Sequence, residues 1–250
     1  MPHCAICDHH VDAWTPYPLT HLRSEFMKLM QPVGSDAAVY QCPHCGCTDR
    51  DRHLWLYLNT IGLTQQLQGA RMLHIAPEIR LEPKFAALGL AEYVRGDLFP
   101  SRAGVQKVDV ERMSFADESF DLIVCNHVME HVSSPERALA EFFRCLKPGG
   151  VLIAQTPYTP LLKKTFEMQS NPEGEFKRIF YGQDDHVRLF GNDIAGYFHA
   201  AGFRGELYPH DAVLGACDRE AMGINPREPL FLFSKPAAAA NDTEACRAAA

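Results

Sequence analysis

The sequence lacks a long hydrophobic segment, an excess of positive charge and an internal repeat. Its mean hydropathy is -0.18, and no apolar run reaches the roughly 18 residues that a membrane-spanning helix requires. The 250 residues carry a net charge of -7, which disfavours a broadly basic surface for nucleic acid. The hydrophobic fraction of 46% and the charged fraction of 22% are ordinary for a globular chain. These values exclude a mainly disordered, collagen-like or coiled-coil protein.

The N-terminus lacks the basic segment followed by an apolar one that marks a secretory signal. We therefore expect a cytoplasmic protein, and disulfides are rare in that reducing environment. The nine cysteines are then expected to be metal ligands, catalytic groups or buried thiols. Cys125 and Cys145 have apolar neighbours and are predicted to be buried, whereas Cys217 and Cys246 receive no role.

Two C-x-x-C pairs lie in the first fifth of the chain, Cys4 with Cys7 and Cys42 with Cys45. Each pair can form a tight turn, and four thiolates complete the tetrahedral shell of structural zinc. Unrelated reduced thiols and a redox pair are the alternatives, but a redox pair normally opens a helix in a βαβ unit, and neither pair does. The pattern predicts one structural zinc without chemistry of its own. Cys47 is left as an ambiguous neighbour.

Strand-like and helix-like segments alternate from residue 71 onward. The alternation predicts an α/β fold with an open sheet and helices on both faces, whose ligands bind beyond the carboxyl ends of the strands. The chain is expected to have four parts: a zinc-ribbon-like metal-binding module at 1–50, a connecting helix at 51–70, the sheet domain at 71–235 and a disordered tail at 236–250.

Polar residues follow the predicted strands of the sheet domain. Glu78 follows the first strand, Asp97 the second, and Asn126 and His127 a long buried one. Asp97 lies close to the spacing of about 20 residues at which an acid binds ribose in nucleotide-binding βαβ units. The spacing alone is a weak indication, because exposed acids at strand ends are common.

Residues 109–157 resemble the second half of the class I S-adenosylmethionine-dependent methyltransferases. The specific parts are SFADESFDLIVCNHVMEHV and RCLKPGGVL. A bacterial subgroup of that family is also similar in its cysteine-knuckle N-terminus, in LHIAPE at the first strand and in YGQDDHVRLFGNDI near the end, so the resemblance covers nearly all of residues 1–235. It implies a Rossmann-like sheet of seven strands with an antiparallel last strand, and S-adenosylmethionine over the carboxyl ends of the first strands.

The resemblance also implies residue roles at the cofactor. By position, Asp97 would hold the ribose hydroxyls, and Asp109 would face the adenine amino group. Met113 would pack on or bond the base, while Asn126 and His127 would lie beside the methionine part and the methyl group.

The first loop departs from the family's usual acid followed by G-x-G-x-G. The corresponding stretch contains His74, Ala76, Pro77 and Glu78, so alanine and glutamate replace two glycines. Pro77 stiffens the turn and removes an N–H donor. The subgroup shares this form, and His74, Ala76 and Glu78 are expected to contact the cofactor. Glu78 either binds the cofactor's ammonium or occupies the space that the cofactor needs.

Methyl transfer requires an aligned acceptor and, for a hydroxyl or amine, removal of a proton. His127 and His186 are the predicted catalytic residues, because histidine is the natural base near neutral pH; His131 is a further candidate. The spacing of His127 and His131 also suits a metal pair, but HVMEH differs from H-E-x-x-H, and the resemblance implies a structural role for Glu130 and His131. The cluster 184–188 around His186 is either an acceptor-binding element or a structural loop.

We expect methyl transfer from S-adenosylmethionine to a small-molecule or sugar-containing acceptor, in a protein that also holds structural zinc. The alternatives are a non-catalytic zinc-containing binding or scaffold protein on the same fold, and an RNA methyltransferase, which a zinc ribbon beside a methyltransferase domain also resembles. The acidic balance favours a small molecule over nucleic acid, and no membrane contact is expected. Residues 158–182 are predicted to cover the substrate. The sequence leaves the oligomeric state open.

Overall fold

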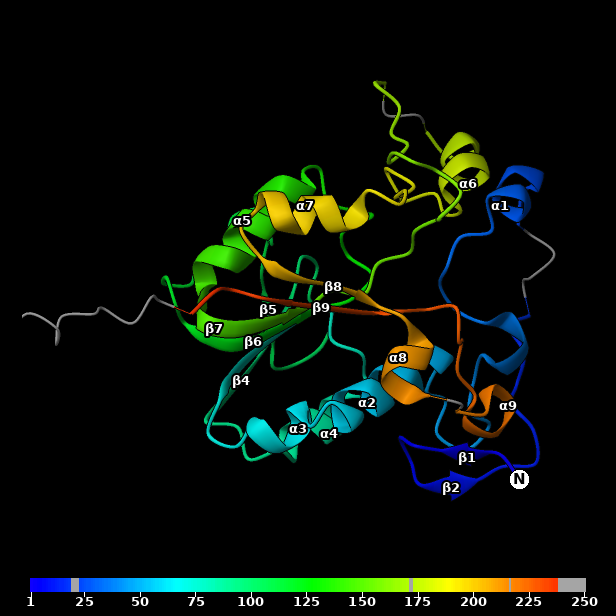
Figure 1. The fold of residues 1–250 in the computed structure, drawn as a ribbon, viewed down its shortest axis with the longest axis horizontal. Helices are drawn as coiled ribbons and strands as arrows, with labels where there is room; N and C mark the ends of the chain where they lie inside the picture. Colours follow the sequence, from blue (N-terminus) through cyan, green and yellow to red (C-terminus); the bar gives the residue numbers. More distant parts are fainter. Residues whose placement is uncertain (19–22, 171–172, 216, 238–250) are drawn as a thin grey trace, which may run out of the picture.

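The computed structural model describes residues 1–18, 23–170, 173–215 and 217–237. A short ribbon combines two segments. In the first, β1 (His3–Cys4) is antiparallel to β2 (His9–His10), and the second is the turn at residues 42–47. Most of the remaining chain surrounds one sheet of seven strands, and the ribbon lies at one end of the molecule (Figure 1). Most of the predicted tail, 238–250, lies outside the described residues.

The large sheet has the strand order β5-β4-β3-β6-β7-β9-β8. Its strands are β3 (Arg71–Ile75), β4 (Glu92–Asp97), β5 (Val105–Lys107), β6 (Phe120–Cys125), β7 (Leu146–Ile153), β8 (Arg204–Tyr208) and β9 (Leu230–Ser234). The first five are parallel to one another, and β9 runs antiparallel to both β7 and β8. The expected Rossmann-like sheet with an antiparallel last strand is confirmed.

Helices cover both faces of this sheet (Figure 1). On one face lie α5 (Pro135–Cys145) and α7 (Ile194–Ala200), and on the other α2 (Asp49–Thr60), α3 (Leu63–Gln66), α4 (Glu82–Ala86) and α8 (His210–Leu214). Ser134 caps α5 by accepting a hydrogen bond from the backbone N–H of Arg137, and proline occupies the first turn. Two apolar cores result, one on each side of the sheet.

The helix α2 does more than connect the ribbon to the sheet domain. Leu54, Tyr57 and Leu58 of α2 are buried in the same core as Met72 of β3 and Leu122 of β6. The cysteines of the ribbon belong to that core as well. The first 70 residues therefore supply part of the layer that covers one face of the sheet.

Arg52 of α2 fastens three distant parts of the chain together. Its buried guanidinium donates to the backbone oxygens of Val39, Cys47 and Gly223. It also lies 4.0 Å from the ring centre of Trp14. Gly223 closes the short α9 (Arg219–Met222), so Arg52 joins the ribbon, α2 and the segment before the last strand.

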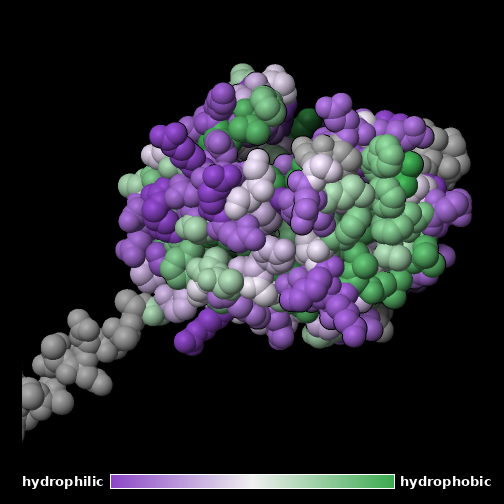
Figure 2. All heavy atoms as spheres, turned by 90° about the horizontal axis from the view of Figure 1, so that it is seen from above, coloured by the Kyte–Doolittle hydropathy of each residue, from purple (hydrophilic) through white to green (hydrophobic). Residues whose placement is uncertain are grey.

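Two further helices lie beyond the sheet, α1 (Glu25–Met30) and α6 (Glu175–Tyr181) (Figure 1). Met27, Tyr181 and Leu189 form a small core between them. Figure 2 shows hydrophobic surface on the half of the molecule that carries these helices, where Leu29 and Phe176 are exposed. A short 3-10 turn, η2 (Ala37–Val39), follows α1. None of the helices in the described ranges has both the length and the apolar character needed to span a membrane.

Candidate active site at the carboxyl edge of the sheet

The carboxyl ends of β3, β4 and β6 meet at one edge. Ile75 is paired with Gly96 on one side and with Cys125 on the other. The residues that follow these strands, Glu78 among them, are therefore neighbours, as expected where strand order reverses in a parallel sheet.

The loop after β3 keeps a turn that normally calls for glycine. Ala76 has a φ of 48°, a left-handed conformation that costs a residue with a Cβ roughly 1–2 kcal/mol. Its N–H donates to the backbone oxygen of Gly96 at 2.8 Å. The turn is thus retained despite the alanine, and β3 ends at Ile75 directly before it.

Glu78 is held by two neighbours at this edge. Its carboxylate accepts a hydrogen bond from Nδ2 of Asn126 at 3.0 Å and pairs with Nε2 of His74 at 2.5 Å. Nδ1 of the fully buried His74 lies 2.8 Å from the hydroxyl of Tyr93. Burial acts to raise the pKa of Glu78, but the charge and hydrogen bond of His74 and the hydrogen bond of Asn126 outweigh it and lower that pKa. Glu78 is therefore a carboxylate, while both ring nitrogens of His74 are engaged inside the fold.

The acids expected at the ribose and the adenine lie at the next strand ends. Oδ1 of Asp97 accepts the N–H of Phe99 at 2.8 Å, and Oδ1 of Asp109 accepts the N–H of Glu111 at 2.9 Å. The N–H of Val108 donates to the backbone oxygen of Asp97, so these acids occupy adjacent strand ends. Met113, by contrast, is buried in the core below this edge.

Asn126 and His127 follow β6 directly. Oδ1 of Asn126 accepts the N–H of Gln155, and the N–H of His127 donates to the Gln155 oxygen at 2.7 Å. His127 adopts a φ of 54°. This turn joins Asn126, at the Glu78 edge, to a His127 side chain that faces a cavity.

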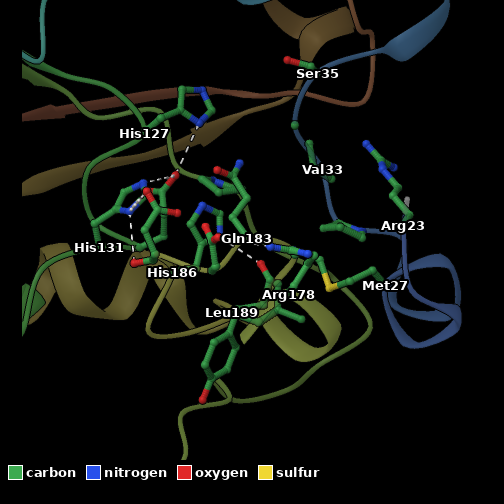
Figure 3. Close-up of a pocket in the computed structure, with 18 of the residues that line it drawn as sticks. Arg23, Met27, Val33, Ser35, His127, His131, Arg178, Gln183, His186 and Leu189 are labelled. Carbon is green, nitrogen blue, oxygen red and sulfur yellow. Dashed lines mark hydrogen bonds and ion pairs between the residues drawn. The ribbon is translucent and has the colours of Figure 1, made fainter. Parts of the chain in front are cut away.

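The cavity has a volume of about 690 Å³ and is formed by segments far apart in the sequence. His127, His131 and His186 lie opposite Arg23, Met27 and Val33 (Figure 3). The structure thus brings the two predicted catalytic histidines, His127 and His186, together in the wall of one cavity. The wall from the N-terminal segment was not predicted, because no local pattern indicates that α1 packs beside α6.

Two of the cavity histidines, His127 and His186, are neutral at pH 7. Burial lowers the pKa of His127 well below its ordinary value and that of His186 to about 4. Nε2 of His127 has no hydrogen-bond partner among the described residues. A neutral imidazole with a free nitrogen can accept a proton.

Arg188, a charged residue of the cavity wall, forms its hydrogen bonds within the protein. Arg188 donates to the backbone oxygens of Met129, Val132 and Ser133 and pairs with Glu167. It thereby fixes the loop after β6, which accounts for its near-complete burial.

Burial raises the pKa of Glu130 to about 8. Its Oε2 has no hydrogen-bond partner among the described residues. Glu130 is accordingly a buried acid, and one of its carboxyl oxygens forms no hydrogen bond within the described structure.

Four cysteines of the ribbon surround one point. One Sγ atom from each of Cys4, Cys7, Cys42 and Cys45 lies within 4.8 Å of the other three. Four thiolates at such a point match the donor set of a closed tetrahedral zinc site. Sγ of Cys47 lies 3.4 Å from Sγ of Cys4 and 3.5 Å from Nη1 of Arg52, outside this set of four.

Residues 71–154 match the family model described as a methyltransferase domain. Residues 71–154 therefore form a methyltransferase domain, and the sheet that contains them has the fold of the class I S-adenosylmethionine-dependent methyltransferases. A demethylmenaquinone methyltransferase from Lactobacillus johnsonii is 23% identical over 182 residues, which cover 71% of this chain and 68% of that protein. The ubiquinone/menaquinone biosynthesis C-methyltransferase UbiE from Methylococcus capsulatus is 31% identical over 99 residues, which cover 38% of this chain and 36% of that protein.

A crystal structure from Listeria monocytogenes, itself assigned by inference as an S-adenosylmethionine dependent methyltransferase, has the same class I methyltransferase fold. It superposes with a TM-score of 0.51 at 12% identity and covers 75% of this chain and 98% of that one. The chain spans only about a third of the Methylococcus relative. The family match covers the sheet from β3 to β7, which places the ribbon, α1 and α6 outside it.

Proposed function

We propose that the protein transfers the methyl group of S-adenosylmethionine to a small polar acceptor bound in the cavity at His127. One observation carries the proposal: Asn126 and His127 are consecutive, and Asn126 bonds Glu78 at the carboxyl edge of the sheet while His127 lines the cavity. A methyl donor on that edge and an acceptor in that cavity would therefore meet at this turn. The cofactor supplies the reactive carbon, and the protein supplies orientation.

The cofactor would be held by residues at the ends of β3, β4 and β6. Asp97 offers Oδ2 to the ribose, because only its Oδ1 is used within the described chain. Asp109 is exposed beside it and suits the adenine amino group. Glu78 is ionised, as pairing with the ammonium of the cofactor requires.

His127 would orient the acceptor and take its proton where the acceptor atom carries one. Its ring is neutral at pH 7. Its Nε2 forms no hydrogen bond within the described part of the protein and lies 3.9 Å from Oε1 of Glu228. His186 lies in the same cavity, with Nδ1 2.9 Å from the oxygen of Tyr181. That contact directs Nε2 of His186 away from Tyr181, so the lone pair of this nitrogen is available to a ligand in the cavity.

The acceptor class follows from the cavity size and its charges. The cavity volume of about 690 Å³ lies in the range of about 300–1,000 Å³ that holds small molecules. Arg23 and Arg50 line it, and neither has an ion-pair partner in the described ranges. They favour an acceptor with an anionic or hydroxyl-rich group. The relatives named as menaquinone and ubiquinone methyltransferases likewise act on small molecules.

The ribbon would hold one structural zinc through Cys4, Cys7, Cys42 and Cys45. Its role is architectural, because four thiolates leave no open position on the ion. The ribbon cysteines share a core with α2, so the ion would stabilise one layer of the sheet domain.

A non-catalytic binding protein is the second candidate, and one observation favours it. Glu78 stands where a glycine would let the cofactor approach, and His74 and Asn126 already satisfy part of its carboxylate. If these contacts are permanent, the cofactor does not enter.

Calorimetric titration with S-adenosylmethionine separates the two candidates. We expect saturable binding that Asp97→Ala weakens and that Glu206→Ala, an exposed change on β8, leaves unaltered. Absence of binding at millimolar cofactor would overturn the enzyme and support the binding protein.

The acceptor class is tested with methyl-labelled S-adenosylmethionine. Label should enter a small-metabolite fraction rather than RNA or protein, and His127→Asn should reduce the incorporation without changing cofactor affinity. Label in RNA alone would replace the small molecule with nucleic acid as the acceptor.

A further inference from the structure

Glu130, His131 and His186 form a compact cluster on the cavity wall. One potential ligand atom from each lies within 4.8 Å of the other two. The rings of His131 and His186 have centres 4.7 Å apart and stand at 85° to each other. Both histidines face the cavity in Figure 3.

The two histidines share one hydrogen-bonding arrangement. Nδ1 of His186 lies 2.9 Å from the backbone oxygen of Tyr181, and Nδ1 of His131 lies 3.3 Å from that of Asp185. A carbonyl oxygen accepts only, so each Nδ1 carries the hydrogen, and in the neutral form of each ring Nε2 presents a lone pair. Backbone carbonyls hold metal-binding histidines in this tautomer in many proteins.

Glu130 lacks the partners that a buried carboxylate needs. Its side chain is only 2% exposed, and Oε2 has no hydrogen-bond partner among the residues that the structure describes. Oε1 lies 3.7 Å from Nδ1 of His127 and 3.9 Å from Nε2 of His131, both beyond hydrogen-bond length. A buried carboxyl group ionises at low cost only beside a cation, and an ion between Glu130 and the two lone pairs would supply that positive charge.

We propose that Glu130, His131 and His186 bind one divalent transition-metal ion at the cavity wall, separate from the ion of the four cysteines. Two imidazoles and one carboxylate suit Zn²⁺, Fe²⁺, Co²⁺ or Mn²⁺ better than the all-oxygen shells of Mg²⁺ and Ca²⁺. Ligand distances of about 2.0–2.2 Å place two ligands of one ion up to about 4.3 Å apart. The cluster therefore needs only a small inward movement to close on an ion.

Three protein ligands leave coordination positions open, unlike the four cysteines. The cluster lines the same cavity as His127, so an oxygen of the acceptor can complete the coordination. Binding to a divalent ion lowers the pKa of such an oxygen. This last step rests on the proposed methyl transfer, whereas the ion site itself does not.

The test uses the full chain with zinc bound at its cysteine site. Mn²⁺ is titrated into this protein, and its binding is followed by electron paramagnetic resonance. We expect one Mn²⁺ per chain, and displacement by Co²⁺ with an absorption spectrum free of the intense thiolate bands. Glu130→Gln, His131→Asn and His186→Asn should each weaken binding by more than about tenfold, since even loss of a residue behind a ligand costs about that much. The matched control is His199→Asn, a surface histidine on α7, which should bind as the wild type does.

His131→Asn keeps the test independent of folding, because this side chain is 32% exposed and its loss should leave the melting temperature unchanged. Binding of neither Mn²⁺ nor Co²⁺ at millimolar concentration, or binding that the three variants leave intact, would overturn the ion site. Cofactor titration on the same samples distinguishes the two proposals: an ion without cofactor binding refutes methyl transfer alone, and cofactor without an ion refutes this site alone.

Discussion

Two clusters at the carboxyl edge of the sheet contain the same residue types and differ in how they are satisfied. In the first, the carboxylate of Glu78 is bonded by His74 and Asn126, and its pKa is lowered. In the second, Glu130 is beside His131 and two further histidines, yet one carboxylate oxygen is unpartnered in the described structure and its pKa is raised to about 8. The first is complete within the fold, whereas the second is complete only with a ligand. A histidine near a glutamate is thus structural or ligand-binding according to whether the fold uses all their polar atoms.

The cysteine cluster is the strongest proposed case of a set of residues that a ligand completes, and the largest effect is expected there. Cys42→Ser should remove the bound zinc and most of the order of residues 1–50, because structural zinc contributes about 10 kcal/mol or more to small sites. The zinc content by mass spectrometry and amide hydrogen exchange of the ribbon would measure both. Cys217→Ser changes a cysteine outside the cluster and should retain one zinc; full zinc content in the Cys42 variant would remove Cys42 from the ligand set.

Glu78→Ala should break the complete cluster at a cost of about 3 kcal/mol in the free energy of unfolding, because it leaves the buried His74 and the amide of Asn126 without a partner. Urea denaturation would measure the loss. Glu206→Ala removes an exposed glutamate from β8 and should change stability by less than about 0.5 kcal/mol. Equal stabilities of the two variants would show that the His74 contact contributes nothing.

Asp49 is a buried acid for which no ligand is proposed, and it tests how far burial alone raises the pKa of a carboxyl group. It is fully buried with Oδ1 unpartnered in the described structure, and burial raises its pKa from 3.8 to about 7. The folded state keeps a proton that the unfolded state has lost between these values, so stability falls as pH rises through this window. Asp49→Asn cannot titrate, and its stability relative to wild type should rise by about 2 kcal/mol from pH 5 to 7, at about 1.4 kcal/mol per pKa unit. Urea denaturation at both pH values measures this difference, and a constant one would show that Asp49 titrates normally.

The smallest effect is expected at Glu130. Glu130→Gln should alter the metal-free protein's stability by less than about 1 kcal/mol, since the fold gives Oε2 no hydrogen bond to lose. Thermal denaturation after removal of Mn²⁺ and Co²⁺ would measure it. A loss of stability as large as that of Glu78→Ala would show that the fold already satisfies Glu130. The two clusters would then not differ.

Local chemistry made much of the molecule predictable. The buried run of β6, the serine cap and proline of α5, and the paired cysteines each act through near neighbours in the chain, so the sheet, its helices and the cysteine cluster could be expected from the sequence. The polar residues after β3, β4 and β6 could also be placed at one edge, because parallel strands all end there. The short β5 and β8 carry too little apolar pattern to be foreseen.

Only the tertiary structure decided which polar atoms are satisfied. The bonds of His74 to Glu78 and the unpartnered oxygen of Glu130 depend on side-chain positions that residue spacing does not specify. The cavity depends on α1 packing against α6, two helices about 150 residues apart in the chain that meet through a few apolar side chains. The sequence by itself therefore determined the fold and the edge where ligands bind, because hydrophobic pattern and turn chemistry are local. The structure decided which part of that edge is open to a ligand, because hydrogen-bond satisfaction depends on contacts between distant segments.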